Sequence, residues 1–143
     1  SQANDYLMAI AAGRWHAHRQ GWWCIIALSP EILLHEGVYF ATTNNAYPYV
    51  QRGTGLHAFE ALFAPSIRQF DTKIVPRSPL SPPGHTTCPQ AEVLYPGEVS
   101  LEHVLHVYVP SDDVAAIFES VSEILHLKLP CNVNPDMFPK VAR

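Results

Sequence analysis

A glutamine and a glutamate, Gln90 and Glu92, stand one residue apart at the start of an apolar run. Side chains alternate between the two faces of a β-strand, so both are predicted to project into one cleft while Ala91 points away. A carboxylate can stabilise a developing positive charge, and a neighbouring neutral amide can orient an acceptor. The pair favours chemistry in which a cationic centre forms beside Glu92. A solvated carboxylate at a strand edge would give the same pattern.

A polar segment follows the apolar run at residues 38–41 and offers groups that could bind a polar ligand. It consists of Thr42, Thr43, Asn44 and Asn45. Hydroxyl and amide groups can both donate and accept hydrogen bonds, although two asparagines after a strand are also ordinary turn residues. Tyr47 and Tyr49 flank Pro48 just beyond it and are placed to stack on an aromatic ligand.

Positive charge collects in the proline-rich segment that precedes the Gln-Ala-Glu tripeptide. Residues 64–90 contain Arg68, Lys73 and Arg77 against the single acid Asp71, a local charge of 3 − 1 = +2. The formal charge of the whole chain is 9 − 13 = −4, which gives no general attraction to nucleic acid. A nucleic acid would therefore be steered locally, by the basic residues of this segment.

The eight histidines raise the question of a metal site. The nearest pairs are His16 with His18, which would share a face of a strand, and His103 with His106, which would share a face only of a helix. No third ligand is placed by spacing, and no cysteine neighbours either pair. The sequence therefore predicts no metal site.

Length and composition indicate one domain over residues 1–143. The chain is 48% apolar and only 15% charged, with 13 prolines, so we expect one core, few surface ion pairs and long loops. The three cysteines are widely spaced, which indicates a reduced, cytoplasmic protein. No signal peptide and no apolar run long enough to span a bilayer are present, so no membrane association is expected.

The first half of the chain predicts two strands and three short helical segments. Residues 22–28 are continuously apolar, which indicates a central strand buried on both faces. A helical turn is expected over residues 30–34, and Gly37 turns the chain into a strand over residues 38–41. Helices are predicted over residues 5–13 and 56–64; the apolar face of the second comprises Leu56, Phe59, Leu62 and Phe63.

The second half predicts a long loop, then strands and one clear helix. Prolines in residues 66–89 are expected to prevent both helix and sheet bonding. Strands follow over residues 91–95 and 104–109, and Ser111 caps a helix. The apolar stripe of that helix, expected to pack inward, comprises Val114, Ile117, Phe118, Val121, Ile124 and Leu125. A last strand over 127–133, broken at Pro130, and an irregular tail complete a mixed α+β pattern.

Several segments, in order, resemble DarT-type DNA ADP-ribosyltransferases. Residues 21–34 (GWWCIIALSPEILL) and 36–46 (EGVYFATTNNA) are similar to a family strand followed by a "PGV.FTDGNA"-like segment. Residues 90–96 (QAEVLYP) resemble its "QAE.LVP"-like strand, and residues 4–13 resemble an "NPMLYAIHRG"-like segment. The likeness extends over about two thirds of the chain.

The resemblance implies the twisted, split β-sheet of ADP-ribosyltransferases, with short helices and long loops. It implies an NAD-dependent glycosyltransferase that moves ADP-ribose to a nucleobase of single-stranded DNA, as a toxin countered by a macrodomain antitoxin. NAD would be the substrate, with no metal. Glu92 would be catalytic. The acceptor would be met by Gln90, Arg77, Lys73 and Tyr49, and the donor by Thr42, Thr43, Asn44, Asn45 and Tyr47.

Two departures from the family pattern leave alternatives open. No "HFTH..NL"-like segment, whose His and Thr meet NAD in the family, occurs in the chain. Three explanations stay open: a fragment, such as a C-terminal portion of a larger domain; a natural truncation; or a diverged relative that binds its donor by other means. Pro89 replaces a basic residue before the Gln. The alternatives are a non-catalytic module that binds nucleic acid or protein, and an ADP-ribosyltransferase acting on protein or RNA. The acceptor base and the oligomeric state do not follow from the sequence.

Overall fold

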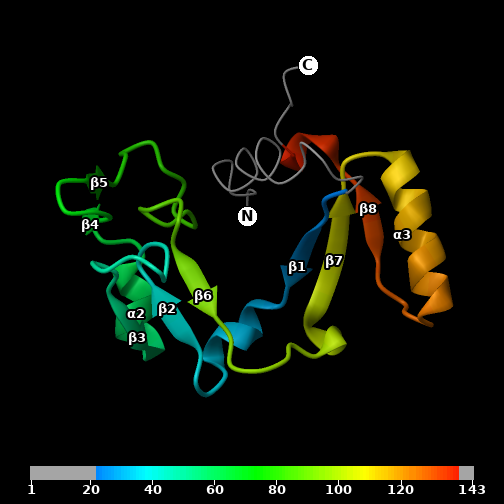
Figure 1. Cartoon of the computed structure of the whole chain (residues 1–143), viewed down its shortest axis with the longest axis horizontal. Coiled ribbons are helices and arrows are strands. Elements are labelled where there is room, and N and C mark those ends of the chain that lie inside the picture. Colours follow the sequence, from blue (N-terminus) through cyan, green and yellow to red (C-terminus); the bar gives the residue numbers. More distant parts are fainter. Residues whose placement is uncertain (1–21, 139–143) are drawn as a thin grey trace. The chain divides into compact units, whose positions relative to one another are not determined.

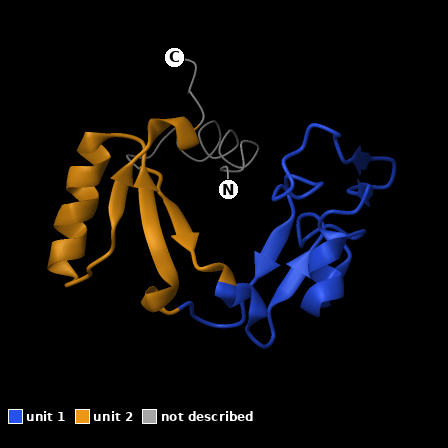
Figure 2. Cartoon of the chain, turned by 180° about the vertical axis from the view of Figure 1, so that it is seen from behind, with its two compact units in different colours: residues 1, 31–99 blue, residues 2–30, 100–143 orange. Residues whose placement is uncertain are grey.

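The structure, a computed structural model, describes residues 22–138 of the chain. The helix expected over residues 5–13 and the pair His16 and His18 lie outside the described residues. The described chain forms two compact units, coloured differently in Figure 2. Residues 31–99 make unit 1, and residues 22–30 with 100–138 make unit 2.

Unit 1 contains a three-stranded antiparallel sheet in the order β3-β2-β6. Its strands are β2 (Tyr39–Ala41), β3 (Arg52–Thr54) and β6 (Glu92–Leu94), so the predicted strands at 38–41 and 91–95 are confirmed. The sequence did not predict β3, because a three-residue strand of Arg, Gly and Thr carries no apolar alternation. It is defined by its pairing with β2.

Helix α2 (Gly55–Ala61) follows β3 and packs the partly buried Ala58 and Phe59 against the core of unit 1. Val38, Phe40 and Leu62 are buried together, and the Phe40 ring meets Phe59 at a centroid distance of 5.4 Å. The predicted helix is thus confirmed but shorter, and Leu56, the first residue of the predicted apolar face, is 71% exposed. Because neighbouring strand residues alternate, the face that carries Ala41 is opposite to the face packed by Phe40.

A two-stranded antiparallel hairpin, β4 (Ser66–Arg68) and β5 (Ile74–Pro76), lies within the segment predicted to be a structureless loop. The prediction was wrong for these residues. Pro76 is the last residue of β5, and in a two-stranded sheet both strands are edges, where a missing N–H group is tolerated. Beyond Pro76 the chain runs without helix or strand until β6, as expected.

Unit 2 is built on the sheet β1-β7-β8, whose strands lie side by side in Figure 1. Strand β1 (Ile25–Leu28) is antiparallel to β7 (Val104–Val109), and β7 is parallel to β8 (Cys131–Val133). The bounds of β7 agree with the prediction. The expectation of a doubly buried central strand at 22–28 was wrong: among the described residues β1 pairs only with β7, and Ile26 is 53% exposed.

Helix α3 (Asp112–Ile124) connects β7 to β8, and the Ser111 hydroxyl accepts a hydrogen bond from the Val114 N–H at 3.4 Å, confirming the predicted cap. The inward stripe is confirmed only in small part, because Ser122 is buried while four of its six residues are exposed, namely Ile117, Val121, Ile124 and Leu125. Short 3₁₀ turns are η2 (Pro30–Leu34), as predicted, η3 (Leu101–His103) and η4 (Pro135–Met137) in the tail expected to be irregular. None of the described helices has the length and apolar character required to span a bilayer.

Candidate active site

Glu92 is the first residue of β6 and stands opposite Ala41 in the register of the sheet. Its side chain is half-buried, on the face of the sheet opposite the Phe40 core. The Oε2 atom accepts a hydrogen bond from the Asn45 backbone N–H at 3.1 Å. The Oε1 atom has no hydrogen-bond partner within residues 22–138. The carboxylate is therefore anchored through one oxygen and open at the other.

The loop between β2 and β3 presents that backbone N–H group. Two hydrogen bonds close the loop: the Thr42 N–H donates to the Gln51 carbonyl at 3.1 Å, and the Gln51 N–H donates to Thr42 Oγ1 at 3.2 Å. At its tip Asn44 Oδ1 accepts from the Ala46 N–H at 2.9 Å, the side-chain turn expected of asparagine. The polar segment after β2 thus shapes the backbone that meets Glu92.

Arg52, on β3, binds the same loop and was missed by the sequence analysis. Its Nε atom donates to Asn45 Oδ1 at 2.5 Å, and its Nη2 atom donates to the Asn45 carbonyl oxygen. No sequence signal could have revealed this contact, because it depends on the unpredicted strand β3. Arg52 therefore binds both oxygens of Asn45, and the backbone N–H group of Asn45 binds Glu92.

Thr42 and Thr43, predicted to bind the donor, lie inside unit 1. They are 2% and 0% exposed, respectively. The Cys88 thiol donates to Thr43 Oγ1 at 3.4 Å, and Thr42 Oγ1 is engaged within the loop. Hydrogen bonding of their side chains to NAD stays a prediction, and among the residues predicted for the donor Asn44, Asn45 and Tyr47 are the ones that reach the surface.

Gln90 lies in a turn before β6 rather than in the strand, so the alternation argument that paired it with Glu92 does not extend to it. The turn is closed by the Ala91 N–H, which donates to the Cys88 carbonyl at 3.0 Å. The Gln90 side-chain oxygen accepts from the Gln69 Nε2 atom. Gln69 is only 4% exposed and is a second residue that the sequence analysis missed.

Two of the predicted stacking residues form an aromatic cluster with the β4–β5 hairpin. The rings of Tyr47 and Phe70 lie with centroids 4.4 Å apart, tilted by 43°. The Tyr49 hydroxyl donates to Asp71 Oδ1 at 3.0 Å, and the Arg68 guanidinium lies 4.1 Å from the centre of the Tyr49 ring. The cluster fixes the orientation of both tyrosines.

The two basic residues predicted for the acceptor have different surroundings. The Arg77 guanidinium donates to the His85 carbonyl at 2.7 Å, to Thr87 Oγ1 at 3.3 Å and to the Pro82 carbonyl at 3.3 Å, which organises the proline-rich loop. Lys73 is exposed, and its ammonium group has no partner among the described residues. Acceptor binding by either residue stays a prediction.

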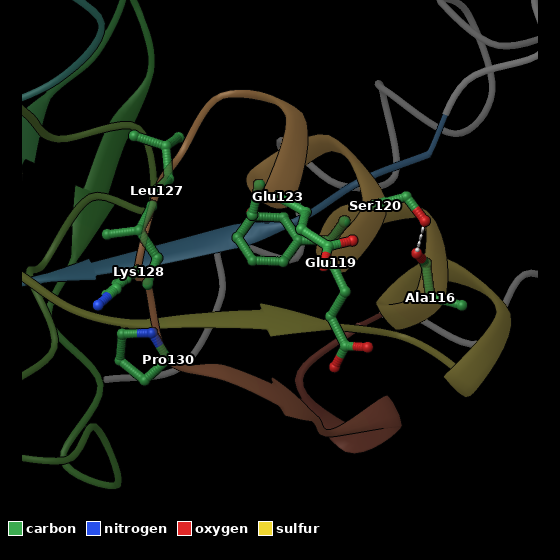
Figure 3. A pocket seen from close by; sticks show the side chains of 10 residues that line it. Ala116, Glu119, Ser120, Glu123, Leu127, Lys128 and Pro130 are labelled. Atoms are coloured by element: carbon green, nitrogen blue, oxygen red, sulfur yellow. Dashed lines mark hydrogen bonds between the residues drawn. The ribbon is translucent and has the colours of Figure 1, made fainter.

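A separate groove of about 810 Å³ lies in unit 2, between α3 and residues 127–130 (Figure 3). Glu119, Glu123 and Lys128 line it, together with Leu127 and Pro130. None of the predicted site residues contributes to this groove. Within residues 22–138 no group of His, Cys, Asp or Glu side chains is arranged to hold a metal ion, and the expectation of a metal-free protein stays a prediction.

Comparison with known proteins places this geometry in a family. A sequence model of the DarT family, described as ssDNA thymidine ADP-ribosyltransferase, matches residues 1–139. No curated protein matches the chain. Among solved structures, Thermosipho africanus DarTG in complex with ADP-ribose is similar, with a TM-score of 0.53 at 15% identity, over 80% of this chain and 28% of that chain. The likeness confirms the predicted α+β ADP-ribosyltransferase fold. The chain spans about 28% of the length of the DarTG chain that it matches.

Proposed function

The chain belongs to the DarT family of ssDNA thymidine ADP-ribosyltransferases, and we propose that it transfers ADP-ribose from NAD to a thymidine base of single-stranded DNA, with Glu92 as catalytic residue. In this reaction the bond between the ribose and nicotinamide breaks, and nicotinamide leaves. The base forms a bond to the same ribose carbon and gives up a proton. Positive charge develops on the ribose as nicotinamide departs.

The observation that carries the proposal is the state of the Glu92 carboxylate. Oε2 is fixed by the Asn45 N–H, and Oε1 is open to accept a hydrogen bond from a ribose hydroxyl. A carboxylate held beside a developing cation stabilises it far more in a water-poor site than in bulk solvent, by about 3 kcal/mol for one well-placed group. The anchor keeps the negative charge from turning away during the reaction.

The remaining contacts of the site are proposed by their position around Glu92. On the donor side, Asn44, Asn45 and Tyr47 belong to the loop that holds the carboxylate. On the acceptor side, Gln90 precedes Glu92 by two residues, and Tyr49 and Lys73 belong to the loop and hairpin that meet through the Tyr49–Asp71 hydrogen bond. Thr42 and Thr43 are hydrogen-bonded inside unit 1 and Arg77 organises the proline-rich loop before Gln90, so direct binding of substrate by these three residues stays a prediction.

The family and the cysteines support a proposal for the setting of the reaction. Cys24, Cys88 and Cys131 are free thiols, which fits a reducing cytoplasm. We propose that the protein acts there as the toxin of a toxin–antitoxin pair and that a macrodomain antitoxin reverses its mark on DNA. Co-expression of such an antitoxin should relieve growth inhibition caused by the chain, and a macrodomain variant unable to cleave ADP-ribose should not.

The test of the catalytic role compares the wild type with Glu92→Gln. Glutamine keeps the size of the side chain and an oxygen that can accept from the Asn45 N–H, but it carries no charge. With labelled NAD and a thymidine-containing oligonucleotide, we expect labelling to fall at least about 100-fold. NAD binding measured by calorimetry should persist. An oligonucleotide of equal length without thymidine serves as the acceptor control.

Two results would contradict the proposal in different ways. Equal labelling by the wild type and Glu92→Gln would remove Glu92 from catalysis. A wild-type protein that binds DNA or protein but shows no saturable NAD binding would be a binding module. Labelling of a cell extract that disappears with protease or ribonuclease treatment, rather than with deoxyribonuclease, would assign a protein or RNA acceptor.

A further inference from the structure

We infer that Arg52 is a positioning residue for Glu92, acting through Asn45. The inference rests on the proposed function of Glu92 and extends it to a residue outside the motifs. Arg52 donates to the side-chain and backbone oxygens of Asn45, and the N–H group of Asn45 donates to Glu92 Oε2. One residue thus connects the guanidinium to the carboxylate.

The sheet register explains why the connection must pass through a third residue. Ala41 stands opposite Arg52 on one side and opposite Glu92 on the other, so all three side chains project from the same face. Arg52 and Glu92 are therefore two strand spacings apart, about 10 Å between their backbones. No ion pair joins them in the described chain. The loop residue Asn45 bridges the gap between them, and Ala41, which lies between Arg52 and Glu92 in the register, is fully buried.

The chemistry of arginine suits this task. Its planar guanidinium presents two donors in a fixed fork, and here both donors engage oxygens of one residue. Holding Oδ1 fixes the side-chain torsion of Asn45, and holding the carbonyl oxygen fixes its backbone. The direction of the Asn45 N–H, and with it the position of Glu92 Oε2, is set as a consequence. Lysine, with one ammonium group, cannot hold both oxygens in the same way.

A different role for the same residue would be to bind the phosphates of the donor directly. The two roles predict different kinetics. A phosphate contact contributes to donor binding, so its loss raises KM for NAD. If Arg52 positions Glu92, removing Arg52 misplaces the carboxylate and weakens stabilisation of the transition state. The value of kcat then falls, and KM for NAD stays nearly unchanged.

The experiment measures kcat and KM for NAD in Arg52→Ala, Arg52→Lys and Lys128→Ala, with a thymidine-containing oligonucleotide as acceptor. For Arg52→Ala we expect kcat to fall about 10- to 100-fold and KM for NAD to change less than about threefold, as for a displacement of a catalytic group by about 1 Å. Arg52→Lys should recover little of the loss. Lys128→Ala removes one positive charge from the separate groove and should match the wild type.

A second comparison asks whether Arg52 acts on Glu92 rather than on the fold. In the Glu92→Gln background, Arg52→Ala should lower the residual rate less than about twofold, because no charge remains to be positioned. An equal loss in both backgrounds would overturn the inference, and so would a raised KM with unchanged kcat. Melting temperatures of the variants should agree within a few degrees.

A readout that needs no activity separates this inference from the proposed function. In ¹⁵N-labelled protein the Asn45 amide resonance should move upfield in both Arg52→Ala and Glu92→Gln, since each change weakens the hydrogen bond to Oε2. The Lys128→Ala spectrum should leave it in place. If the wild type made no product but Asn45 responded in this way, the proposed function would fail and the linkage would stand. An Asn45 resonance unaffected by Arg52→Ala would overturn the linkage itself.

Discussion

The Glu92 carboxylate, the proposed catalytic group, is anchored by a single hydrogen bond from a loop that is itself held in place. One hydrogen bond from the Asn45 N–H orients Oε2, and the loop that carries this donor is closed at Thr42 and Gln51 and held at its tip by Arg52. The Asn45 N–H group is therefore held in place, although the Glu92 side chain that it contacts is only half-buried. A second hydrogen-bond donor would have occupied Oε1, the atom that in the proposed mechanism accepts a hydrogen bond from a ribose hydroxyl.

The resemblance of short segments to a family was enough to predict Glu92 and Asn45 as site residues, but not the residues that contact them. Glu92 and Asn45 belong to short contiguous segments, so their roles could be predicted without knowing the fold, and these roles stay predictions. Arg52 and Gln69 act through contacts with residues seven and twenty-one positions away. Those contacts exist only because β3 pairs with β2 and because the hairpin returns Gln69 to Gln90, and neither pairing has a sequence pattern of its own.

Cys131 offers a residue-scale prediction in unit 2. Burial raises the pKa of the Cys131 thiol, and the nearby Glu119 carboxylate and Cys24 raise it further, whereas burial alone raises the pKa of Cys24. Glu119→Gln should therefore lower the pKa of Cys131 and leave that of Cys24 unchanged. Since the thiolate is the nucleophile, alkylation of Cys131 by iodoacetamide at pH 8 should become faster. Peptide mass spectrometry reports the rate for each cysteine.

Glu123→Gln is the matched control, because Glu123 lines the same groove but does not contribute to the Cys131 pKa. An unchanged Cys131 titration in Glu119→Gln would contradict the assigned cause. The raised pKa values also determine how the stability of the fold depends on pH. Both thiols contribute stability that is complete below the pKa of an unfolded cysteine, about 8.5, and is lost as the pH rises through their raised folded pKa values.

At the scale of elements, the packing of β3 against α2 is tight enough to exclude a methyl group. A Cβ atom added at Gly53 would lie 2.9 Å from the Ala58 Cβ, a non-bonded distance that Cβ atoms in proteins essentially never show. Gly53→Ala should therefore lower the free energy of unfolding by about 1 to 3 kcal/mol. Urea denaturation of the two proteins measures the difference. Arg52 precedes Gly53, so the same variant should also reduce labelling of DNA.

A double-mutant cycle with Ala58→Gly tests the cause of that loss. Ala58→Gly alone should cost about 1 kcal/mol, because glycine weakens a helix. In its background Gly53→Ala should cost clearly less than in the wild type, since the opposing methyl group is gone. Strictly additive losses would show that the clash with Ala58 is not the reason for the glycine.

The elements that could be predicted from the sequence are those whose signals are local. Strand β7 alternates over six residues, and α3 begins at a capping serine followed by two aspartates, so both were recognised. The position of β1 at the end of the described sheet was not recognised, because an apolar run such as 22–28 is compatible with an edge strand and with a central one. The β4–β5 hairpin was not recognised either, because the prolines were expected to exclude strands, whereas a proline at the end of a strand does not prevent a two-stranded sheet. Short strands are specified by their partners rather than by their own residues.

At the scale of the whole molecule, the sequence of unit 1 is inserted within the sequence of unit 2. Residues 31–99 carry the sheet with Glu92, and the segments on either side of them build the sheet β1-β7-β8. The prediction of a single domain over 1–143 stays a prediction. Every residue discussed for the reaction lies in unit 1, while the groove beside α3 lies in unit 2.

Charge at this scale predicts how DNA binding should respond to salt. The chain has a formal charge of −4, and of the basic residues at 64–90 Arg68 is paired with Asp71 at 3.1 Å while Arg77 donates to loop oxygens. Lys73 keeps its ammonium group available to a phosphate. For single strands the slope of log K against log salt is about −0.7 per neutralised phosphate, so we expect a shallow slope of about −0.7 to −1.5 for the wild type.

Fluorescence anisotropy of a labelled thymidine oligonucleotide, titrated between about 50 and 200 mM NaCl, measures this slope. Lys73→Gln should make it less negative by about 0.7, because one phosphate contact is lost, and Lys128→Gln should leave it unchanged. A wild-type slope steeper than about −3 would mean that several further cations meet the phosphates, and the acceptor surface would then have to extend well beyond the hairpin. A shallow slope that Lys73→Gln does not alter would place the contact on another residue. With few phosphates neutralised, the proposed discrimination in favour of thymidine strands would come from groups that meet the base, and the residues proposed for that contact in unit 1 are Gln90, Tyr49 and the loop that holds Glu92.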